Sequence, residues 1–141
     1  MVKPCLTLLL TSLLLACSAM PQQSESVYQQ VGGLPGIYTI TDHFISQIEQ
    51  EPRILKYFKG SDVARFRTHF AQQLCVETGG PCEYQGESME VVHEGMNISE
   101  ADFNLTVELL IDAMQDAGLS YTARNKILAK LAPMRSSMLY R

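Results

Sequence analysis

Histidines are the side chains in this sequence with the clearest capacity for metal chemistry, because a neutral imidazole is a common metal ligand. There are three, at positions 43, 69 and 93. His43 follows Asp42 on the polar side of a predicted helix and is interpreted as a solvated surface residue. His69 and His93 fall on two separate predicted helices. A lone histidine near an apolar face is more often a satisfied core or boundary residue than a ligand, so these residues alone leave metal binding open.

The first residues read as an export signal rather than as part of a fold. After a basic residue comes the apolar run 5–17, CLTLLLTSLLLAC, which is shorter than the ~20 residues that a membrane-spanning helix needs. Its last letters, LLAC, resemble the bacterial lipobox, so residues 1–16 are predicted to be removed and Cys17 to be lipidated. Lipidation of this type would anchor the protein on the periplasmic side of the cell envelope. The alternative is ordinary cleavage after Ala16 or Ala19, which leaves a soluble periplasmic protein.

Export would place the remaining cysteines in an oxidising compartment. Residues 17–27 are polar and are predicted to form a tether, which leaves residues 28–141 as the folded domain. Cys75 and Cys82 lie seven positions apart, a spacing unlike that of a C-x-x-C redox or zinc pair. We expect a disulfide across the turn at 78–81, which would stabilise the fold by about 2–3 kcal/mol. Two free thiols, one on a helix and one in a loop, are the alternative.

The domain is predicted to be all-α. Apolar residues recur every three or four positions, which is the spacing of one face of a helix, and strand-like alternation is absent. Glycine, proline and capping residues divide the pattern into long helices at about 36–50, 62–78, 100–117 and 121–132, with short helical turns near 55–58 and 89–95. Ser99 to Asp102 resembles a capping box with Asp in place of Glu.

Several fragments, taken in order, resemble the group 1 truncated globins. They are YQQVGG at 28–33, YFKG at 57–60, GGP at 79–81, Tyr84-x-Gly86, Met89-x-x-x-His93-x-Gly95, Ile98-x-x-Ala101-Asp102-Phe103 and Ala132-Pro133. Each fragment is short, but together they keep the order and spacing of that family over about residues 28–138.

The resemblance implies a globin reduced to a two-on-two helical sandwich around one haem b. Carried over residue by residue, it makes His93 the proximal ligand of the haem iron, with its second ring nitrogen donating to a backbone carbonyl. Met89, one helical turn earlier, would pack beside the haem. Phe58 would press on the macrocycle from the distal side, and Tyr84 would lie along its edge or near a propionate. Plain core packing is the alternative for these aromatic residues.

The distal side departs from the family pattern. Many relatives carry a tyrosine one position after Phe44, and its hydroxyl donates a hydrogen bond to bound oxygen, whereas this chain has Ile45 there. On the next long helix, an advance of about 100° per residue places four side chains on one arc. They are Phe66, His69, Phe70 and Gln73.

Three states of the sixth iron position follow from this arc. His69 could bind the iron directly, as a histidine does at the matching place in some family members. His69 or Gln73 could instead donate a hydrogen bond to a bound gas. In the third state the pocket is apolar and oxygen leaves quickly. We expect an apolar or weakly polar distal pocket.

The function implied by the resemblance is the binding of oxygen or other diatomic gases, with nitric oxide and carbon monoxide among them. An enzyme on the same haem, a nitric oxide dioxygenase or a weak peroxidase, is the first alternative. It would need an electron source, and the chain carries no flavin or nicotinamide motif. A haem-free helical envelope lipoprotein is the second, and it leaves the glycine, tyrosine and histidine pattern unexplained. The formal charge of −4 argues against a nucleic-acid partner.

Overall fold

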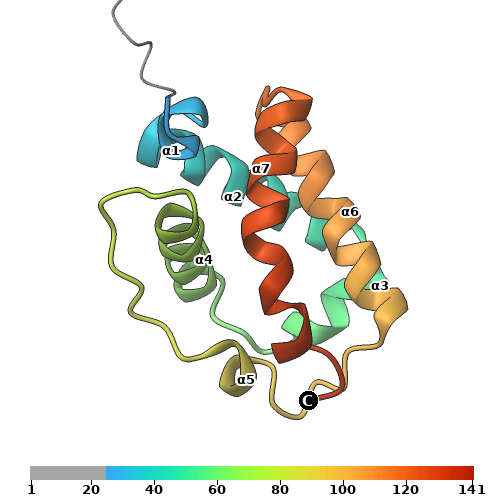
Figure 1. The fold of residues 1–141 in the computed structure, drawn as a ribbon. Helices are drawn as coiled ribbons and strands as arrows, with labels where there is room; N and C mark the ends of the chain where they lie inside the picture. The colour runs from blue at the N-terminus through green and yellow to red at the C-terminus, as the bar shows by residue number, and fades with distance from the viewer. Residues whose placement is uncertain (1–24) are drawn as a thin grey trace, which may run out of the picture.

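The computed structural model describes residues 25–141, and these residues are mostly helical (Figure 1). The predicted signal peptide, Cys17 and most of the predicted tether lie outside the described residues. The elements are α1 (Val27–Gln30), α2 (Gly33–Gln50), α3 (Pro52–Leu55), the 3-10 helix η1 (Lys56–Phe58), α4 (Val63–Glu77), α5 (Met89–Val92), α6 (Glu100–Asp116), α7 (Tyr121–Leu131) and the 3-10 helix η2 (Ala132–Ser137). The described part contains no strand, only an isolated bridge between Ile98 and Leu139. Over the same residues, no helix has the length and apolar character needed to cross a membrane.

Side-chain caps set where three of the long helices begin. Asp62, Ser99 and Ser120 each accept a hydrogen bond from a backbone N–H in the first turn of α4, α6 and α7. These starts agree with the sequence prediction to within one or two residues. α2 begins earlier than predicted, because Gly32 and Gly33 adopt φ angles of 85° and 66°, which let the chain turn directly into the helix.

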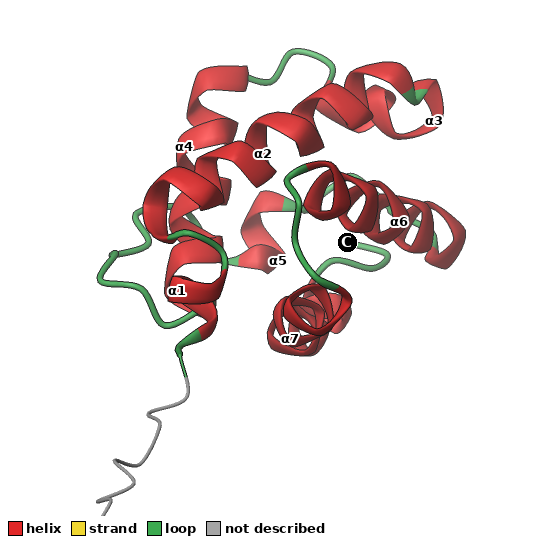
Figure 2. Ribbon diagram, turned by 90° about the horizontal axis from the view of Figure 1, so that it is seen from above, coloured by secondary structure: helices red, strands yellow, loops and turns green. Residues whose placement is uncertain are grey.

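The long helices form two layers, with α2 and α4 in one and α6 and α7 in the other (Figure 2). α2 makes the broadest contact with α6 and also packs along α4. Its buried apolar face consists of Ile37, Ile40, Phe44 and Ile48, which the helical repeat places on one side. This arrangement is the two-on-two sandwich that the sequence implied.

Asp102 differs from its predicted role at the start of α6. Its backbone N–H does donate to Ser99. Its carboxylate, however, has a side-chain exposure of 8% and binds Arg53, Lys56 and Tyr57. The capping-box prediction is therefore wrong for this side chain, because two cations and a hydroxyl are stronger partners for a carboxylate than one backbone N–H. The result is a tie between the α3–η1 corner and α6.

Candidate functional site

His93 lies at the end of the short helix α5. Ser88 caps this helix by accepting a hydrogen bond from the backbone N–H of Val91, and after one turn the chain leaves the helix at His93. The imidazole Nδ1–H donates to the carbonyl oxygen of Met89 at 2.7 Å, because a carbonyl can only accept. This is the backbone partner expected from the sequence. In the neutral imidazole this hydrogen bond leaves Nε2 without a proton, which is the form that binds a metal.

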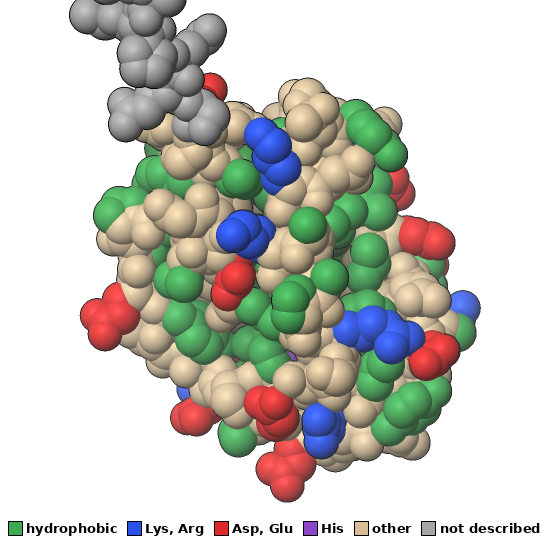
Figure 3. All heavy atoms as spheres, in the orientation of Figure 1, with side chains coloured by type: hydrophobic (Ala, Val, Ile, Leu, Met, Phe, Trp, Pro, Cys, Tyr) green, Lys and Arg blue, Asp and Glu red, His purple; other side chains and the backbone are tan. Residues whose placement is uncertain are grey.

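The chain around α5 is attached to the C-terminal end of the domain. α5 packs against η2, the 3-10 helix that follows α7. Further along, the backbone N–H of Tyr140 donates to Ile98 at 3.1 Å, and that of Asn97 donates to Arg141 at 2.8 Å. Figure 2 shows α5 between α4 and α7, and Figure 3 shows hydrophobic side chains interspersed with acidic and basic ones on the face of the molecule seen in Figure 1. His93 is therefore presented from a short element that is held by the C-terminal end of the domain.

Four phenylalanines form a continuous row across α2, η1 and α4. The ring centroid of Phe70 lies 5.0 Å from that of Phe44 and 5.5 Å from that of Phe66, and Phe66 lies 5.0 Å from Phe58. Phe44 belongs to the buried core, whereas the other three are only partly buried against it. This phenylalanine row (Phe44, Phe58, Phe66 and Phe70) therefore leads from the core to a partly open apolar surface.

Ile45 lies beside the phenylalanine row. It lines a cavity of about 80 Å³ together with Phe58 and Phe66. The other lining residues are Ile48, Glu49, Leu55, Ser61 and Val63, of which Glu49 and Ser61 are polar and exposed. An isoleucine side chain neither donates nor accepts a hydrogen bond, so the position where many relatives carry a tyrosine is apolar here.

Gln73, one of the two polar residues on the predicted arc of α4, pairs with its own helix. Its Nε2 donates to the carboxylate of Glu77, one turn further along, at 2.9 Å. The sequence offered Gln73 as a donor to a bound gas. The structure instead commits one of its amide N–H groups to Glu77, because a carboxylate four residues away is a close and strong acceptor.

The other polar residue of the arc, His69, faces the segment between α4 and α5. Its ring meets that of Tyr84 edge-on, with 6.2 Å between the centroids. The Tyr84 O–H donates to the carbonyl oxygen of Glu87 at 2.8 Å. Burial and the nearby Glu87 carboxylate raise the pKa of Tyr84, so its hydroxyl stays protonated at neutral pH. The sequence singled out His69 and Tyr84 separately and missed their contact, which depends on how the segment folds back.

These residues suit a haem. Within residues 25–141, no three His, Cys, Asp or Glu side chains gather where they could hold a metal ion. A macrocycle that brings four nitrogens of its own needs only one protein ligand on one side, and the hydrogen bond of His93 to Met89 leaves Nε2 available for that role. Phe58, Phe66 and Phe70 keep part of their surfaces open, as a flat apolar ring would require.

Comparison with known proteins gives the family of the chain. The family model described as bacterial-like globin matches residues 26–140. The group 1 truncated hemoglobin GlbN of Nostoc sp. is 27% identical over 115 residues, covering 82% of this chain and 98% of its own. GlbN of Mycolicibacterium paratuberculosis is 27% identical over 112 residues, covering 79% of this chain and 82% of its own.

Solved structures show the same fold. The crystal structure of the truncated hemoglobin of Tetrahymena pyriformis in its Fe(III) form matches with a TM-score of 0.79 at 23% identity, covering 83% of this chain and 100% of that one. The 2/2 hemoglobin from Synechococcus sp., solved in the cyanomet state with covalently attached heme, matches with a TM-score of 0.76 at 20% identity, covering 83% of this chain and 100% of that one. With a family model that spans most of the domain, the chain belongs to the bacterial-like globin family.

Proposed function

We propose that this globin, a haem protein that binds diatomic gases, holds one haem b through His93 and favours carbon monoxide and nitric oxide over dioxygen. Held by His93, the haem would supply the gas-binding chemistry, in which dioxygen would carry more negative charge than carbon monoxide. The distal side chains Ile45, Phe66 and Phe70 donate no hydrogen bond to that charge. This apolar distal side distinguishes the chain from relatives that carry a tyrosine.

The observation that supports the gas preference is the position of Ile45. It lines the same small cavity as Phe58 and Phe66, so a side chain at position 45 reaches the apolar surface on which the gas would rest. A hydrogen bond to a charged acceptor contributes about 1.5–3 kcal/mol, which is a factor of about 10–150 in affinity. The gas preference follows from the absence of that contribution at position 45.

The decisive experiment introduces the tyrosine that many relatives carry. Ile45→Tyr should slow oxygen dissociation by about 10-fold or more, in line with one added hydrogen bond to a charged group, and should change carbon monoxide dissociation little. Ile45→Phe is the matched control, because it adds the ring without the hydroxyl and should not slow oxygen release. Stopped-flow and flash-photolysis kinetics measure these rates. Equal oxygen dissociation in wild type and Ile45→Tyr would show that another group already supplies the donor.

We further propose that the sixth iron position stays open to the gas rather than binding His69. This is supported by the contact of the His69 ring with Tyr84. Ferrous and ferric absorption spectra, recorded with and without carbon monoxide, should match between wild type and His69→Ala. A six-coordinate ferric spectrum that becomes five-coordinate only in His69→Ala would refute this. An apolar distal side favours neither a dioxygenase, which needs stably held oxygen, nor a peroxidase, which needs a distal base.

Export and lipid anchoring complete the proposal. They are supported by the apolar run at 5–17 and by the LLAC letters that end in Cys17. The disulfide between Cys75 and Cys82 suits an oxidising compartment. Labelled palmitate should enter the wild-type protein in a bacterial host and not Cys17→Ser, whereas Cys5→Ser, the matched control within the signal, should still be labelled. Equal labelling of Cys17→Ser and wild type would rule out this anchor.

A further inference from the structure

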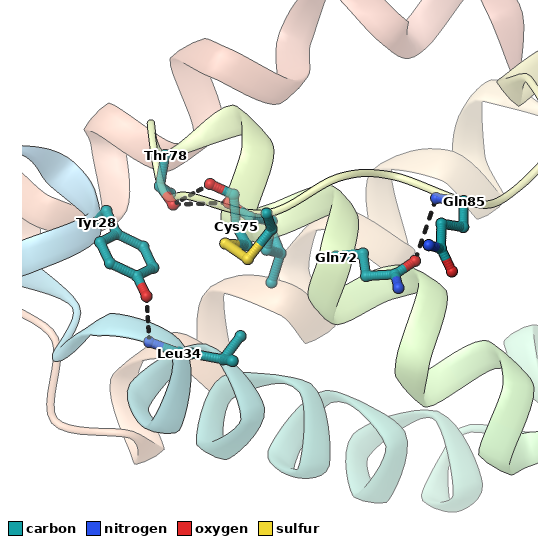
Figure 4. Close-up of a disulfide and its surroundings, with 8 residues drawn as sticks. Tyr28, Leu34, Gln72, Cys75, Thr78 and Gln85 are labelled. Carbon is teal, nitrogen blue, oxygen red and sulfur yellow. Dashed lines mark hydrogen bonds between the residues drawn. A yellow bond between two sulfur atoms is a disulfide. The ribbon is translucent and has the colours of Figure 1, made fainter.

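The segment that leads to His93 runs along one face of α4. Residues 78–88 connect α4 to α5 and form no regular helix or strand. On α4, His69, Gln72 and Cys75 follow one another at intervals of three, so they share a face of the helix. Each of the three contacts this segment. The segment therefore lies back along α4 before α5 begins, as Figure 4 shows near the disulfide.

The three contacts differ in strength. Cys75 and Cys82 are joined by a disulfide, with their Cα atoms 5.9 Å apart. Gln72 accepts a hydrogen bond from the exposed backbone N–H of Gln85 at 3.3 Å, and the third contact is the edge-on aromatic one. A long, exposed hydrogen bond contributes little, because water replaces it readily. The disulfide is the strongest of the three.

The residues just before Cys82 are also held in place by contacts other than the disulfide. The Thr78 carbonyl accepts a hydrogen bond from the backbone N–H of Tyr28 at 3.0 Å. The backbone at Gly80 packs tightly against Tyr28 of α1 and against Cys75. A Cβ added to Gly80 would lie only 2.5 Å from the Tyr28 ring and 2.6 Å from the Cys75 Sγ, so a larger residue would not fit there. Breaking the disulfide would therefore free the stretch between it and α5 while leaving α4 in place.

We propose that the Cys75–Cys82 disulfide positions His93 and makes the retention of haem depend on thiol redox state. The inference rests on the haem assignment and not on the gas preference. A dithiol attacks the sulfur of Cys82, which is the partly exposed cysteine of the pair. The S–S bond breaks, two protein thiols form and the dithiol closes to a cyclic disulfide, so two electrons and two protons pass to the protein. The freed stretch then fixes the position of α5 and His93 less firmly, and haem leaves faster.

The rate of haem transfer to excess apomyoglobin tests this on the purified holoprotein, before and after treatment with dithiothreitol. Reduction should raise the rate about 10-fold, within the roughly 10–100-fold range seen when groups that orient a metal ligand are removed. Cys82→Ser should match the reduced wild type. Cys82→Ser also provides the matched control, because this variant keeps the other cysteines but lacks the disulfide. Dithiothreitol should therefore not change its rate of haem transfer. Equal rates for oxidised and reduced wild type would overturn the proposal.

Hydrogen exchange of the haem-free protein gives a second readout that does not depend on haem. Reduction should speed amide exchange in residues 82–93 and leave α2 and α6 unchanged, because the disulfide joins only α4 to the connecting segment. A uniform rise across all helices would show that the disulfide serves global stability alone, and it would overturn the positioning role. Failure of the Ile45→Tyr experiment would affect neither measurement, so the two proposals fail separately.

Discussion

At the scale of single residues, the site depends on which imidazole is free to bind iron. The Nδ1–H of His93 is taken by the Met89 carbonyl at 2.7 Å, which fixes the tautomer and leaves Nε2 available. His69 faces Tyr84. His43, interpreted from the sequence as solvated, is partly buried on α2. Of the three, His93 combines a fixed tautomer with a place at the end of a helix.

His93→Gly should abolish stoichiometric haem binding, because it removes the imidazole that holds the iron. Free imidazole added to this variant should restore part of the haem absorption, since it can occupy the space that the side chain leaves. The measurement is the ratio of haem to protein after reconstitution with hemin. His69→Ala is the control and should keep full haem content. A normal haem content in His93→Gly without imidazole would remove this residue from the proximal position.

At the residue scale, the sequence allows prediction where a property depends on side-chain type alone. Ile45 has no hydrogen-bonding group in any conformation, so the sequence alone predicts an apolar position. The side-chain direction of Gln73 could not be predicted in the same way, because its amide has several acceptors within reach and the structure decides in favour of Glu77. The contact between His69 and Tyr84 depends on a segment whose course the sequence does not specify.

At the scale of elements, local signals predicted helix starts well and long-range ion pairs poorly. Ser99 and Ser120 cap α6 and α7 through backbone N–H groups of the next turn, so a short stretch of sequence contains both partners. Asp102 lies within such a stretch, yet its carboxylate binds Arg53 and Tyr57, which are 49 and 45 positions away. A local capping rule could not find those partners.

Tyr57→Phe should destabilise the protein mainly at pH values above 3.8, where the Asp102 carboxylate is ionised in the folded and the unfolded protein. The hydrogen bond from Tyr57 is the largest cause that lowers the pKa of Asp102, from an ordinary 3.8 to about 2, with Arg53 and Lys56 adding to it. A lowered pKa contributes stability that is fully present above 3.8 and is lost as the pH falls through about 2. The melting temperature of Tyr57→Phe should therefore lie several degrees below wild type near neutral pH, and the gap should narrow as the pH falls towards 2.

Thermal unfolding followed by circular dichroism across this pH range measures the gap. Tyr121→Phe is the matched control, because Tyr121 is 73% exposed and its hydroxyl is remote from the Asp102 cluster. Its melting temperature should equal that of wild type at every pH. A constant gap between Tyr57→Phe and wild type at all pH values would show that Tyr57 contributes packing and not the hydrogen bond.

At the scale of the whole molecule, the apolar residues divide into two groups with different roles. The buried group runs through α2, α4, α6 and α7 and includes Leu74, which is 1% exposed. The second group is the partly buried end of the phenylalanine row, including Phe70 one turn before Leu74 on the same helix. Folding buries the first group, whereas the second stays partly open, and we propose that haem covers it. The core and the open end of the phenylalanine row therefore meet on the same face of α4, with Leu74 buried and Phe70 only partly buried.

Leu74→Ala and Phe70→Ala should separate these two roles. Leu74→Ala leaves a void in the core and should lower the free energy of unfolding by about 2–5 kcal/mol, equally with and without haem. Phe70→Ala should cost the haem-free protein less, because its ring is only partly buried, but it should also reduce the extra stability that haem confers. Denaturant unfolding of both variants and wild type, each with and without haem, measures the two effects. If haem added the same stability to Phe70→Ala as to Leu74→Ala, the phenylalanine row would belong to the core alone, and the haem-facing role assigned to its open end would be wrong.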